Sequence, residues 1–277
     1  MKHIYKIKSP LRYPGGKTRA LKTIIPLVPD FNEYREPFIG GGSVFFSIKQ
    51  TFPGKVYWIN DLNYDLFSFW KNTQENLDNL VKTIKNIKKT SDNGRELYDS
   101  LNKKVNKLNQ FERAVRFFVL NRITYSGTVD AGGYTKRSYE ERFTDSSIER
   151  LSKIESIING VKITNKDYSV LVKKPGKNVF IFLDPPYFST SYKIYGKVDH
   201  LEFDHHRFAS IMEKCNHKWL ITYDNAEEIK NMFDFAYIQE WSQKYGMSNN
   251  IEKNSSKKNE LLISNFPLET NNQPKLI

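Results

Sequence analysis

Short runs of apolar residues recur along the chain, and their alternation with helix-like segments constrains the fold more than any other feature. Most runs are rich in β-branched and aromatic residues, and most are followed by a turn and a segment with helical spacing. Strands that alternate with helices in this way indicate an α/β protein with a sheet at its core. The runs that we expect to form strands are residues 34–39, 56–60, 161–164, 179–183, 218–223, 235–239 and 260–264.

The stretch from residue 63 to residue 160 interrupts this alternation. It is polar, it contains few strand-like runs, and parts of it carry apolar residues at helical spacing. Those parts are residues 63–87, 95–108 and 111–122. Residues 126–143 contain three glycines and are expected to form a loop. We therefore predict an α/β domain made of residues 1–62 and 161–277, with a mainly helical subdomain inserted at residues 63–160.

The charge balance points to a polyanionic partner. The chain has 43 Lys and Arg residues against 31 Asp and Glu residues, a net charge of +12, which favours association with nucleic acid. A single cysteine, Cys215, excludes an internal disulfide and a cysteine-based zinc cluster, and we expect no metal site. No apolar run approaches about 18 residues and no apolar N-terminal segment is visible, so we expect a cytoplasmic protein without a membrane span.

The strongest local signal is the tetrapeptide Asp-Pro-Pro-Tyr at residues 184–187, directly after the apolar run 179–183. A carboxylate at the carboxyl end of a buried strand lies where open α/β sheets bind their ligands. The prolines stiffen the turn, so the Pro185 carbonyl group can serve as a second acceptor beside Asp184, with the Tyr187 ring next to both. Two acceptors and a flat ring suit the exocyclic amine of a planar base. The alternative is a structural turn in which Asp184 only caps the strand.

A second signal is the glycine-rich segment at residues 36–43, EPFIGGGS. Glycines let a ligand approach the backbone, and the start of the helix that follows favours negative charge. Asp61 follows the next strand, where an acid is placed to accept hydrogen bonds from ribose hydroxyl groups. The alternatives are a purely structural glycine turn and an Asp61 that caps a helix. The segment lacks GxGxxG spacing, so we expect no dinucleotide pyrophosphate site.

A third signal lies at residues 11–17, LRYPGGK, ahead of a predicted helix. Lys17 in this turn is placed to hold a carboxylate or a phosphate group. The alternative is a solvated basic surface formed by Arg12, Lys17, Arg19 and Lys22, which is the usual meaning of such a charge run.

Taken in order, these motifs resemble the Dam-type bacterial DNA adenine methyltransferases. The order is PGGK, EPFIGGGS, Asp61, the insertion and DPPY, and the resemblance extends from Leu11 to about Phe266. Further matches are LNR at 120–122 with Tyr125, the pair Asp167-Tyr168, and ELLISN at 260–265. The motif order and DPPY are specific together, whereas single glycine turns are not. The chain departs from Dam at Tyr13-Pro14 and Ser126-Gly127. The resemblance therefore does not identify the DNA sequence that this chain recognises.

The resemblance implies a Rossmann-like methyltransferase fold that binds S-adenosylmethionine (SAM), with the insertion as the target-recognition region. The implied catalytic set is Asp184, Pro185 and Tyr187. The residues implied as cofactor contacts are Tyr13, Lys17, Pro37, Phe38, Gly40, Gly42, Asp61, Asp167 and Asp184. Arg122, Tyr125 and the 126–143 loop match the region that contacts DNA. Within that loop, basic residues interleaved with aromatic ones favour DNA contact at Tyr134, Lys136, Arg137 and Arg142, although a solvated loop has the same pattern.

The resulting hypothesis is a site-specific enzyme that transfers a methyl group from SAM to N6 of an adenine flipped out of duplex DNA. One alternative is an N4-cytosine methyltransferase, which shares the chemistry but more often has Ser at the position of Asp184. A second alternative is a non-catalytic DNA-binding protein on the same scaffold. The expected partners are double-stranded DNA and a restriction endonuclease that acts on the same site, and we expect a monomer.

Overall fold

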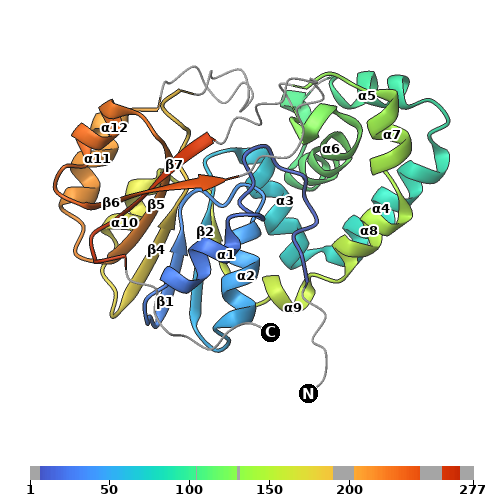
Figure 1. Cartoon of the computed structure of the whole chain (residues 1–277). Coiled ribbons are helices and arrows are strands. Elements are labelled where there is room, and N and C mark those ends of the chain that lie inside the picture. The colour runs from blue at the N-terminus through green and yellow to red at the C-terminus, as the bar shows by residue number, and fades with distance from the viewer. Residues whose placement is uncertain (1–6, 104, 130–131, 190–202, 244–257, 269–277) are drawn as a thin grey trace.

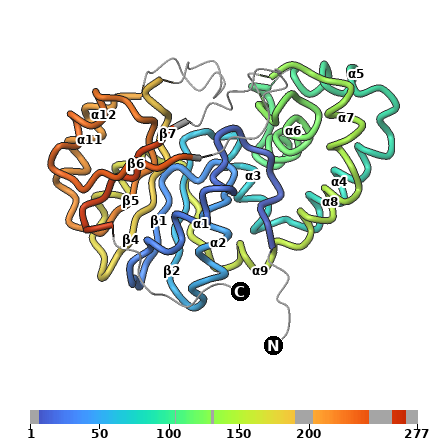
Figure 2. The backbone as a smooth tube through the Cα atoms, in the orientation of Figure 1, coloured from blue at the N-terminus to red at the C-terminus, as the bar shows by residue number. Residues whose placement is uncertain are grey.

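The computed structural model describes most of the chain and has two lobes (Figure 1). One lobe contains the β-sheet with helices on both faces, and the other consists of helices from the region 77–152. The described residues are 7–103, 105–129, 132–189, 203–243 and 258–268. The N-terminal segment, dark blue in Figure 2, runs between the lobes, and the backbone N–H of Arg12 donates to the Asn121 side chain of the helical lobe.

The sheet contains seven strands in the order β3-β2-β1-β4-β5-β7-β6. Their bounds are β1 Glu33–Glu36, β2 Val56–Asn60, β3 Lys162–Thr164, β4 Val179–Leu183, β5 Lys218–Asp224, β6 Tyr237–Gln243 and β7 Lys258–Ser264. Strands β1 to β5 pair in parallel, and β7 is antiparallel to both β5 and β6. This mostly parallel, Rossmann-like sheet confirms the predicted α/β fold.

Strand β4 illustrates why the sheet is buried on both faces. All five of its side chains are buried. Phe180 and Phe182 join one hydrophobic cluster, whereas Val179, Ile181 and Leu183 join the other, as the two-residue period of a strand requires. Helices α1 Leu21–Ile24, α2 Ser43–Thr51 and α3 Tyr64–Glu75 contribute to the first cluster. Helices α10 Tyr168–Lys173, α11 His205–Glu213 and α12 Glu227–Met232 contribute to the second.

The strand order predicts a ligand-binding crevice at one place. Strand β1 pairs with β2 on one side and with β4 on the other, so the chain builds the sheet outward in two directions from β1. In open α/β sheets, ligands bind at the carboxyl ends of the strands at such a switch point. The ends of β1 and β4 therefore mark the expected site.

Among the described residues, the regular elements between β2 and β3 are all helical. After α3, the α-helices of this inserted region are α4 Leu77–Thr90, α5 Gly94–Leu101, α6 Gln110–Ile123, α7 Lys136–Arg142, α8 Asp145–Ser152 and α9 Glu155–Ile158. Helix α6 packs along α3, with the rings of Phe69 and Phe118 stacked at 5.9 Å between centroids. Asp65 of α3 also accepts hydrogen bonds from Arg113 at 2.6 Å and Arg116 at 2.7 Å, both on α6. The helical lobe is thus joined to the sheet lobe by apolar packing and by a buried ion-pair network.

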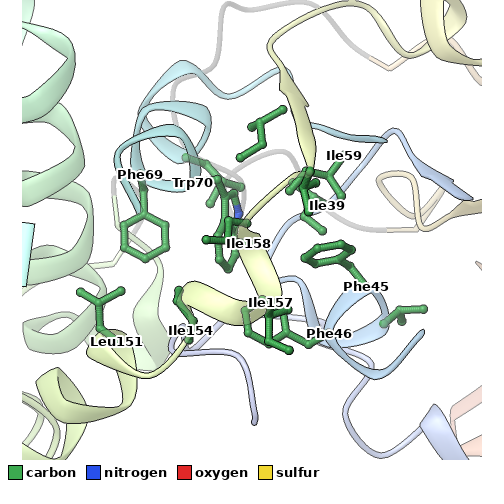
Figure 3. Close-up of a cluster of buried hydrophobic side chains, with 14 of the residues drawn as sticks. Ile39, Phe45, Phe46, Ile59, Phe69, Trp70, Leu151, Ile154, Ile157 and Ile158 are labelled. Carbon is green, nitrogen blue, oxygen red and sulfur yellow. The ribbon is translucent and has the colours of Figure 1, made fainter. Parts of the chain in front are cut away.

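A continuous apolar cluster crosses the boundary between the lobes (Figure 3). Ile157 and Ile158 of α9 lie between α2 and α3, and Ile154 and Leu151 extend the cluster to α8. On the other side the cluster includes Phe45, Phe46, Phe69 and Trp70. The insertion therefore shares its core with the sheet lobe.

Several predicted boundaries are wrong. The strand predicted at 34–39 ends at Glu36, because Pro37 cannot donate to the ladder. The strand predicted at 235–239 is β6, at 237–243. The helix predicted at 63–87 is interrupted at Asn76, which has a non-helical backbone (φ −140°, ψ 33°).

Two further corrections concern the insertion. The helix predicted at 95–108 ends at Leu101, where the Asn102 side chain donates to the carbonyl group of Tyr98. The loop predicted at 126–143 contains helix α7, which begins after Thr135; the Thr135 hydroxyl accepts the backbone N–H of Ser138. Within the described ranges, no helix combines the length and apolar character needed to cross a membrane.

Candidate active site

Acidic side chains end or follow five neighbouring parallel strands. Glu36 ends β1 and Asp224 ends β5, while Asp61, Asp167 and Asp184 follow β2, β3 and β4. Because parallel strands end at the same edge of a sheet, these groups lie at the edge where the crevice is expected. The sequence predicted Asp61, Asp167 and Asp184 as site residues, but it did not identify Glu36 or Asp224.

One oxygen of the Asp184 carboxylate is held by two donors. Thr222 Oγ1 donates to Asp184 Oδ1 at 2.7 Å, and Lys17 Nζ lies 2.9 Å from the same oxygen. Both donors are buried, whereas the Asp184 side chain is 24% exposed. No donor among the described residues contacts Oδ2. The carboxylate is therefore fixed through one oxygen and can accept a hydrogen bond from a ligand through the other.

Lys17 links the acid to the aromatic residue of the tetrapeptide. Its Nζ lies 4.8 Å from the centroid of the Tyr187 ring and donates to the carbonyl group of Gly15 at 3.2 Å. The structure thus brings Lys17, Asp184 and Tyr187 together, although they lie far apart in the sequence. The sequence placed Lys17 at the cofactor, and its contact with Asp184 was not foreseen.

The turn after the tetrapeptide is anchored by β5. The carboxylate of Asp224 accepts the backbone N–H groups of Phe188 at 2.9 Å and Ser189 at 2.8 Å. Thr222 and Asp224, both missed in the sequence, hold the beginning and the end of this turn. Asp224 follows an apolar run, the same signal that identified Asp61, whereas Thr222 lies inside the run and carries no signal of its own.

The glycine turn after β1 lies against Tyr13. Gly40 (φ +46°) and Gly42 (φ +72°) adopt left-handed backbone conformations. A Cβ atom on Gly40 would lie 2.9 Å from the Tyr13 ring, and one on Gly41 would lie 2.5 Å from Tyr13 Cβ. The glycines therefore allow the LRYPGGK segment to cover this turn. Pro37 precedes the turn, and its carbonyl group accepts a hydrogen bond from the Asn60 side chain.

Asp61 ties the ends of β1 and β2 together. Its Oδ2 accepts the backbone N–H of Gly40 and its Oδ1 that of Asn63, both at 3.0 Å. Burial raises the pKa of Asp61 to about 6, although these hydrogen bonds favour the ionised form. Asn63, rather than Asp61, caps helix α3. An ionised carboxylate has about four acceptor positions, so Asp61 retains capacity for a ligand.

Phe38 and Asp167 lie on the α10 side of the crevice. The Phe38 ring packs 5.5 Å from Tyr168 and 6.1 Å from Phe208, measured between centroids. The carboxylate of Asp167 accepts hydrogen bonds from Arg207 at 2.9 and 3.2 Å. Partial burial opposes ionisation, but hydrogen bonds from Arg207 and Ser169 prevail and lower the pKa of Asp167. Asp167 is thus a negatively charged, partly exposed group beside an aromatic wall.

Glu36 is buried at the centre of the crevice. Burial raises the pKa of Glu36 well above its usual value, and the nearby carboxylates of Asp184 and Asp61 raise it further. The Tyr34 hydroxyl donates to its Oε2 and opposes this effect. The raised pKa favours the uncharged form of Glu36, which reduces the repulsion between the three acids at this site.

The first residues implied for DNA contact lie at the end of α6. Tyr125 lies just beyond α6, is 69% exposed, and precedes Ser126, which has a left-handed backbone (φ 52°). Arg122, near the end of α6, is buried, and its Nε has no hydrogen-bond partner. Asn121 connects this region to the N-terminal segment by donating to the backbone carbonyl groups of Arg12 and Gly127.

The remaining candidates lie on or near α7. Lys136 and Arg137 are exposed and pair with Glu140 and Glu141 one turn later, at 3.7 and 3.1 Å. Arg142 lines the same pocket as Arg122. Tyr134 is half-buried and packs against Gly94, where a Cβ atom would lie 2.9 Å from its ring. The structure therefore brings Arg122 and Arg142 together and leaves Lys136 and Arg137 on an exposed helical surface.

Comparisons of the sequence with known proteins identify a family. A family model described as D12 class N6 adenine-specific DNA methyltransferase matches residues 13–247. The type II methyltransferase M.MjaIII of Methanocaldococcus jannaschii is 27% identical over 237 residues, covering 76% of this chain and 81% of the relative. The type II methyltransferase M1.LlaDCHI of Lactococcus lactis is 29% identical over 65% of this chain, and this chain spans 66% of its length. A DNA adenine methylase of Salmonella typhi is 27% identical, with 64% of each chain covered.

Proposed function

The chain belongs to the D12 class of N6 adenine-specific DNA methyltransferases, and on that premise we propose how its residues carry out the reaction. Asp184, Pro185 and Tyr187 bind an adenine flipped out of double-stranded DNA, and SAM provides the methyl group. The single observation that carries this proposal is the Asp184 carboxylate, which is held through Oδ1 and free of protein donors at Oδ2 among the described residues.

The acceptors at this site address the main chemical difficulty of the reaction. The amino nitrogen of adenine is a poor nucleophile because its lone pair is delocalised into the ring. We propose that Asp184 Oδ2 and the carbonyl oxygen of Pro185 accept hydrogen bonds from its two N–H groups. These hydrogen bonds favour an sp³-like nitrogen whose lone pair is available for direct attack, so positioning and electrostatics provide the catalysis.

Tyr187 is proposed to form the stacking surface for the base. Its half-buried ring contacts Lys17 Nζ and lies 6.1 Å from the Tyr223 ring, measured between centroids. A ring already fixed by such contacts loses little further freedom when a flipped base stacks on it. The anchoring of Phe188 and Ser189 by Asp224 keeps the same turn in place.

The residues around the glycine turn fit SAM by the chemistry of their donors and acceptors. Asp61 offers carboxylate oxygens for ribose hydroxyl groups, and Asp167 offers a charged acceptor for an adenine amine beside the Phe38 ring. The left-handed glycines Gly40 and Gly42 keep the backbone of the turn free of side chains. SAM would supply an electrophilic methyl group on a sulfonium centre. We also propose that Tyr13, Lys17 and Pro37 contact SAM.

DNA binding is proposed for the inserted region 63–160 together with the N-terminal segment. The exposed Tyr125 at the end of α6 is suited to stack on bases at the flipped site. Arg122, Tyr134, Lys136, Arg137 and Arg142 are proposed to provide phosphate contacts and base readout. Because two relatives are named type II methyltransferases, we also propose a restriction endonuclease of the same specificity as a functional partner. We further propose that the enzyme is a monomer.

The proposal is tested by sequencing base modifications in DNA from a methylation-free host that expresses this protein. N6-methyladenine within one short motif, absent from cells that express Asp184→Ala, is the expected result. Methylcytosine at the motif would contradict the assignment of the base. Unmodified DNA in the presence of folded, SAM-binding wild-type protein would contradict the proposed reaction.

A further inference from the structure

A pocket of about 380 Å³ lies where the N-terminal segment meets the helical lobe. Its wall includes residues 9–12 of that segment, Arg122 near the end of α6, and five residues around α7 and α8: Glu141, Arg142, Thr144, Ser146 and Arg150. Four of the lining residues are arginines: Arg12, Arg122, Arg142 and Arg150. This pocket is separate from the crevice at the carboxyl ends of the strands.

Arg122 is the central observation. Its side chain is 3% exposed, its Nε is buried without a hydrogen-bond partner, and its guanidinium lies 5.2 Å from the Phe118 ring centroid. The Nη1 atom of Arg12 is likewise buried and without a partner. Buried cations are normally paired, because removing a guanidinium from water without an anionic partner costs several kcal/mol. Two buried donors at this pocket, Arg122 Nε and Arg12 Nη1, thus have no hydrogen-bond acceptor.

The arginines of the pocket also repel each other. Burial lowers the pKa of Arg122, the charges of Arg150, Arg12 and Arg142 act in the same direction, and together they bring it to about 9. The carboxylate in the wall, Glu141, offsets only part of this repulsion, because it is shared between Arg142 and Arg137. It accepts two hydrogen bonds from Arg137 at 3.1 Å, and Arg142 lies 3.6 Å from it.

We propose that Arg12, Arg122, Arg142 and Arg150 form a binding site for one phosphate-type oxyanion. A tetrahedral oxyanion matches several converging guanidinium groups, which donate in planar pairs. The hydroxyl groups of Thr144 and Ser146, at the start of α8, lie in the same wall and add neutral donors. The anion is a backbone phosphodiester of DNA or a free phosphate group. In the first form the inference rests on the proposed function, because it requires duplex DNA at this face.

The binding test uses the purified protein without SAM or DNA. Inorganic phosphate is titrated at constant ionic strength against chloride, and the melting temperature is recorded. The test variants are Arg150→Gln, at the exposed rim, and Arg122→Met, at the buried end. Lys153→Gln is the matched control, since this exposed residue near the end of α8 loses the same charge but does not line the pocket.

The expected result is a saturable rise in melting temperature with phosphate for the wild type and for Lys153→Gln. Arg150→Gln should bind phosphate about tenfold more weakly, as expected for the loss of one charge-assisted contact. Arg122→Met should melt higher than the wild type in chloride and should not respond to phosphate, because the uncompensated charge is gone. A role of Arg122 in packing alone predicts the opposite, with Arg122→Met melting lower and phosphate acting equally on all variants.

Duplex DNA identifies the source of the anion. If the site holds a backbone phosphate, free phosphate competes with DNA, and Arg150→Gln reduces the slope of log affinity against log salt by about one unit relative to Lys153→Gln. If the site holds a free anion, phosphate raises the melting temperature while that slope stays unchanged. The inference is overturned when Arg150→Gln and Arg122→Met match Lys153→Gln in both assays. Both assays omit SAM, so a failure of methyl transfer does not affect them.

Discussion

The hydroxyl group of Thr222 provides a sharp test of how the active site works. Thr222 is fully buried, and its Oγ1 donates to Asp184 Oδ1 at 2.7 Å. Thr222→Val removes this donor while filling nearly the same space, and Thr222→Ser retains it. We expect the valine variant to fold and to bind DNA, but to hold the Asp184 carboxylate less firmly against the base.

The size of the effect follows from the contacts of Asp184. A hydrogen bond to a charged group contributes about 1.5–3 kcal/mol, which corresponds to roughly 10- to 150-fold in rate if all of it acts in the reactive arrangement. Lys17 Nζ still holds the same oxygen at 2.9 Å in the variant. We therefore expect the lower end of this range, a loss of about tenfold.

The assay is a single-turnover methylation rate with saturating DNA and SAM, measured beside the equilibrium affinity for DNA. Thr222→Val should lower the rate about tenfold and leave the affinity within about threefold, because the lost contact orients Asp184 and does not touch DNA. Thr222→Ser should restore the rate. A valine variant as fast as the wild type, or a serine variant as slow as valine, would refute the positioning role of this hydroxyl.

Four further predictions concern the buried ionisable residues Lys17, Asp61 and Asp65. Lys17→Met removes the cation beside Asp184 and the Tyr187 ring and should lower the single-turnover rate about 100-fold, whereas an unchanged rate would exclude Lys17 from the site. The pKa of Asp61 is raised to about 6, so calorimetry should show SAM affinity falling as pH drops through 6, with Asp61→Asn removing this dependence. The folded state also binds this proton more tightly than the unfolded state, so the stability contributed by Asp61 falls as pH rises from about 4 to about 6. Asp65→Asn leaves Arg113 and Arg116 without their anion and should reduce the free energy of unfolding in urea by about 3 kcal/mol, and a change below about 1 kcal/mol would refute the structural role of the network.

The sequence predicted strands well where both faces of the sheet are buried. Strands β2 and β4 have the predicted bounds, because such strands read as continuous apolar runs. Strand β6 was misplaced because it is an edge strand with the polar sequence YIQEWSQ, while the apolar residues Phe233 and Phe235 before it pack against Trp219. Helix α7 was missed because glycines dominated the interpretation of its surroundings. Its signal was the spacing of Lys136 and Glu140, which pair one turn apart.

The site was predictable where its chemistry is local and not where it depends on the fold. Residues at strand ends, such as Asp61 and Asp184, are visible from a run and the acid that follows it. The partners of these acids come from elsewhere in the chain. Thr222 is an ordinary buried residue of β5 until the parallel pairing of β4 and β5 places it beside Asp184. Arg122 looked like a surface cation for DNA, and only the packing of the helical lobe makes it a buried charge without a partner.

The N-terminal segment connects the three parts of the site, although most of it has no helix or strand. Arg12 is bonded to Asn121 of the helical lobe and lines the arginine pocket. Its neighbour Tyr13 lies on Gly40 and Gly41 at the glycine turn, and Lys17 reaches Asp184. The six residues from Arg12 to Lys17 thus contact the proposed DNA-binding lobe, the proposed cofactor turn and the proposed catalytic residue Asp184. The fold therefore brings LRYPGGK next to Asn121 and Asp184, which lie more than a hundred residues away in the sequence, and one short stretch of backbone links all three contacts.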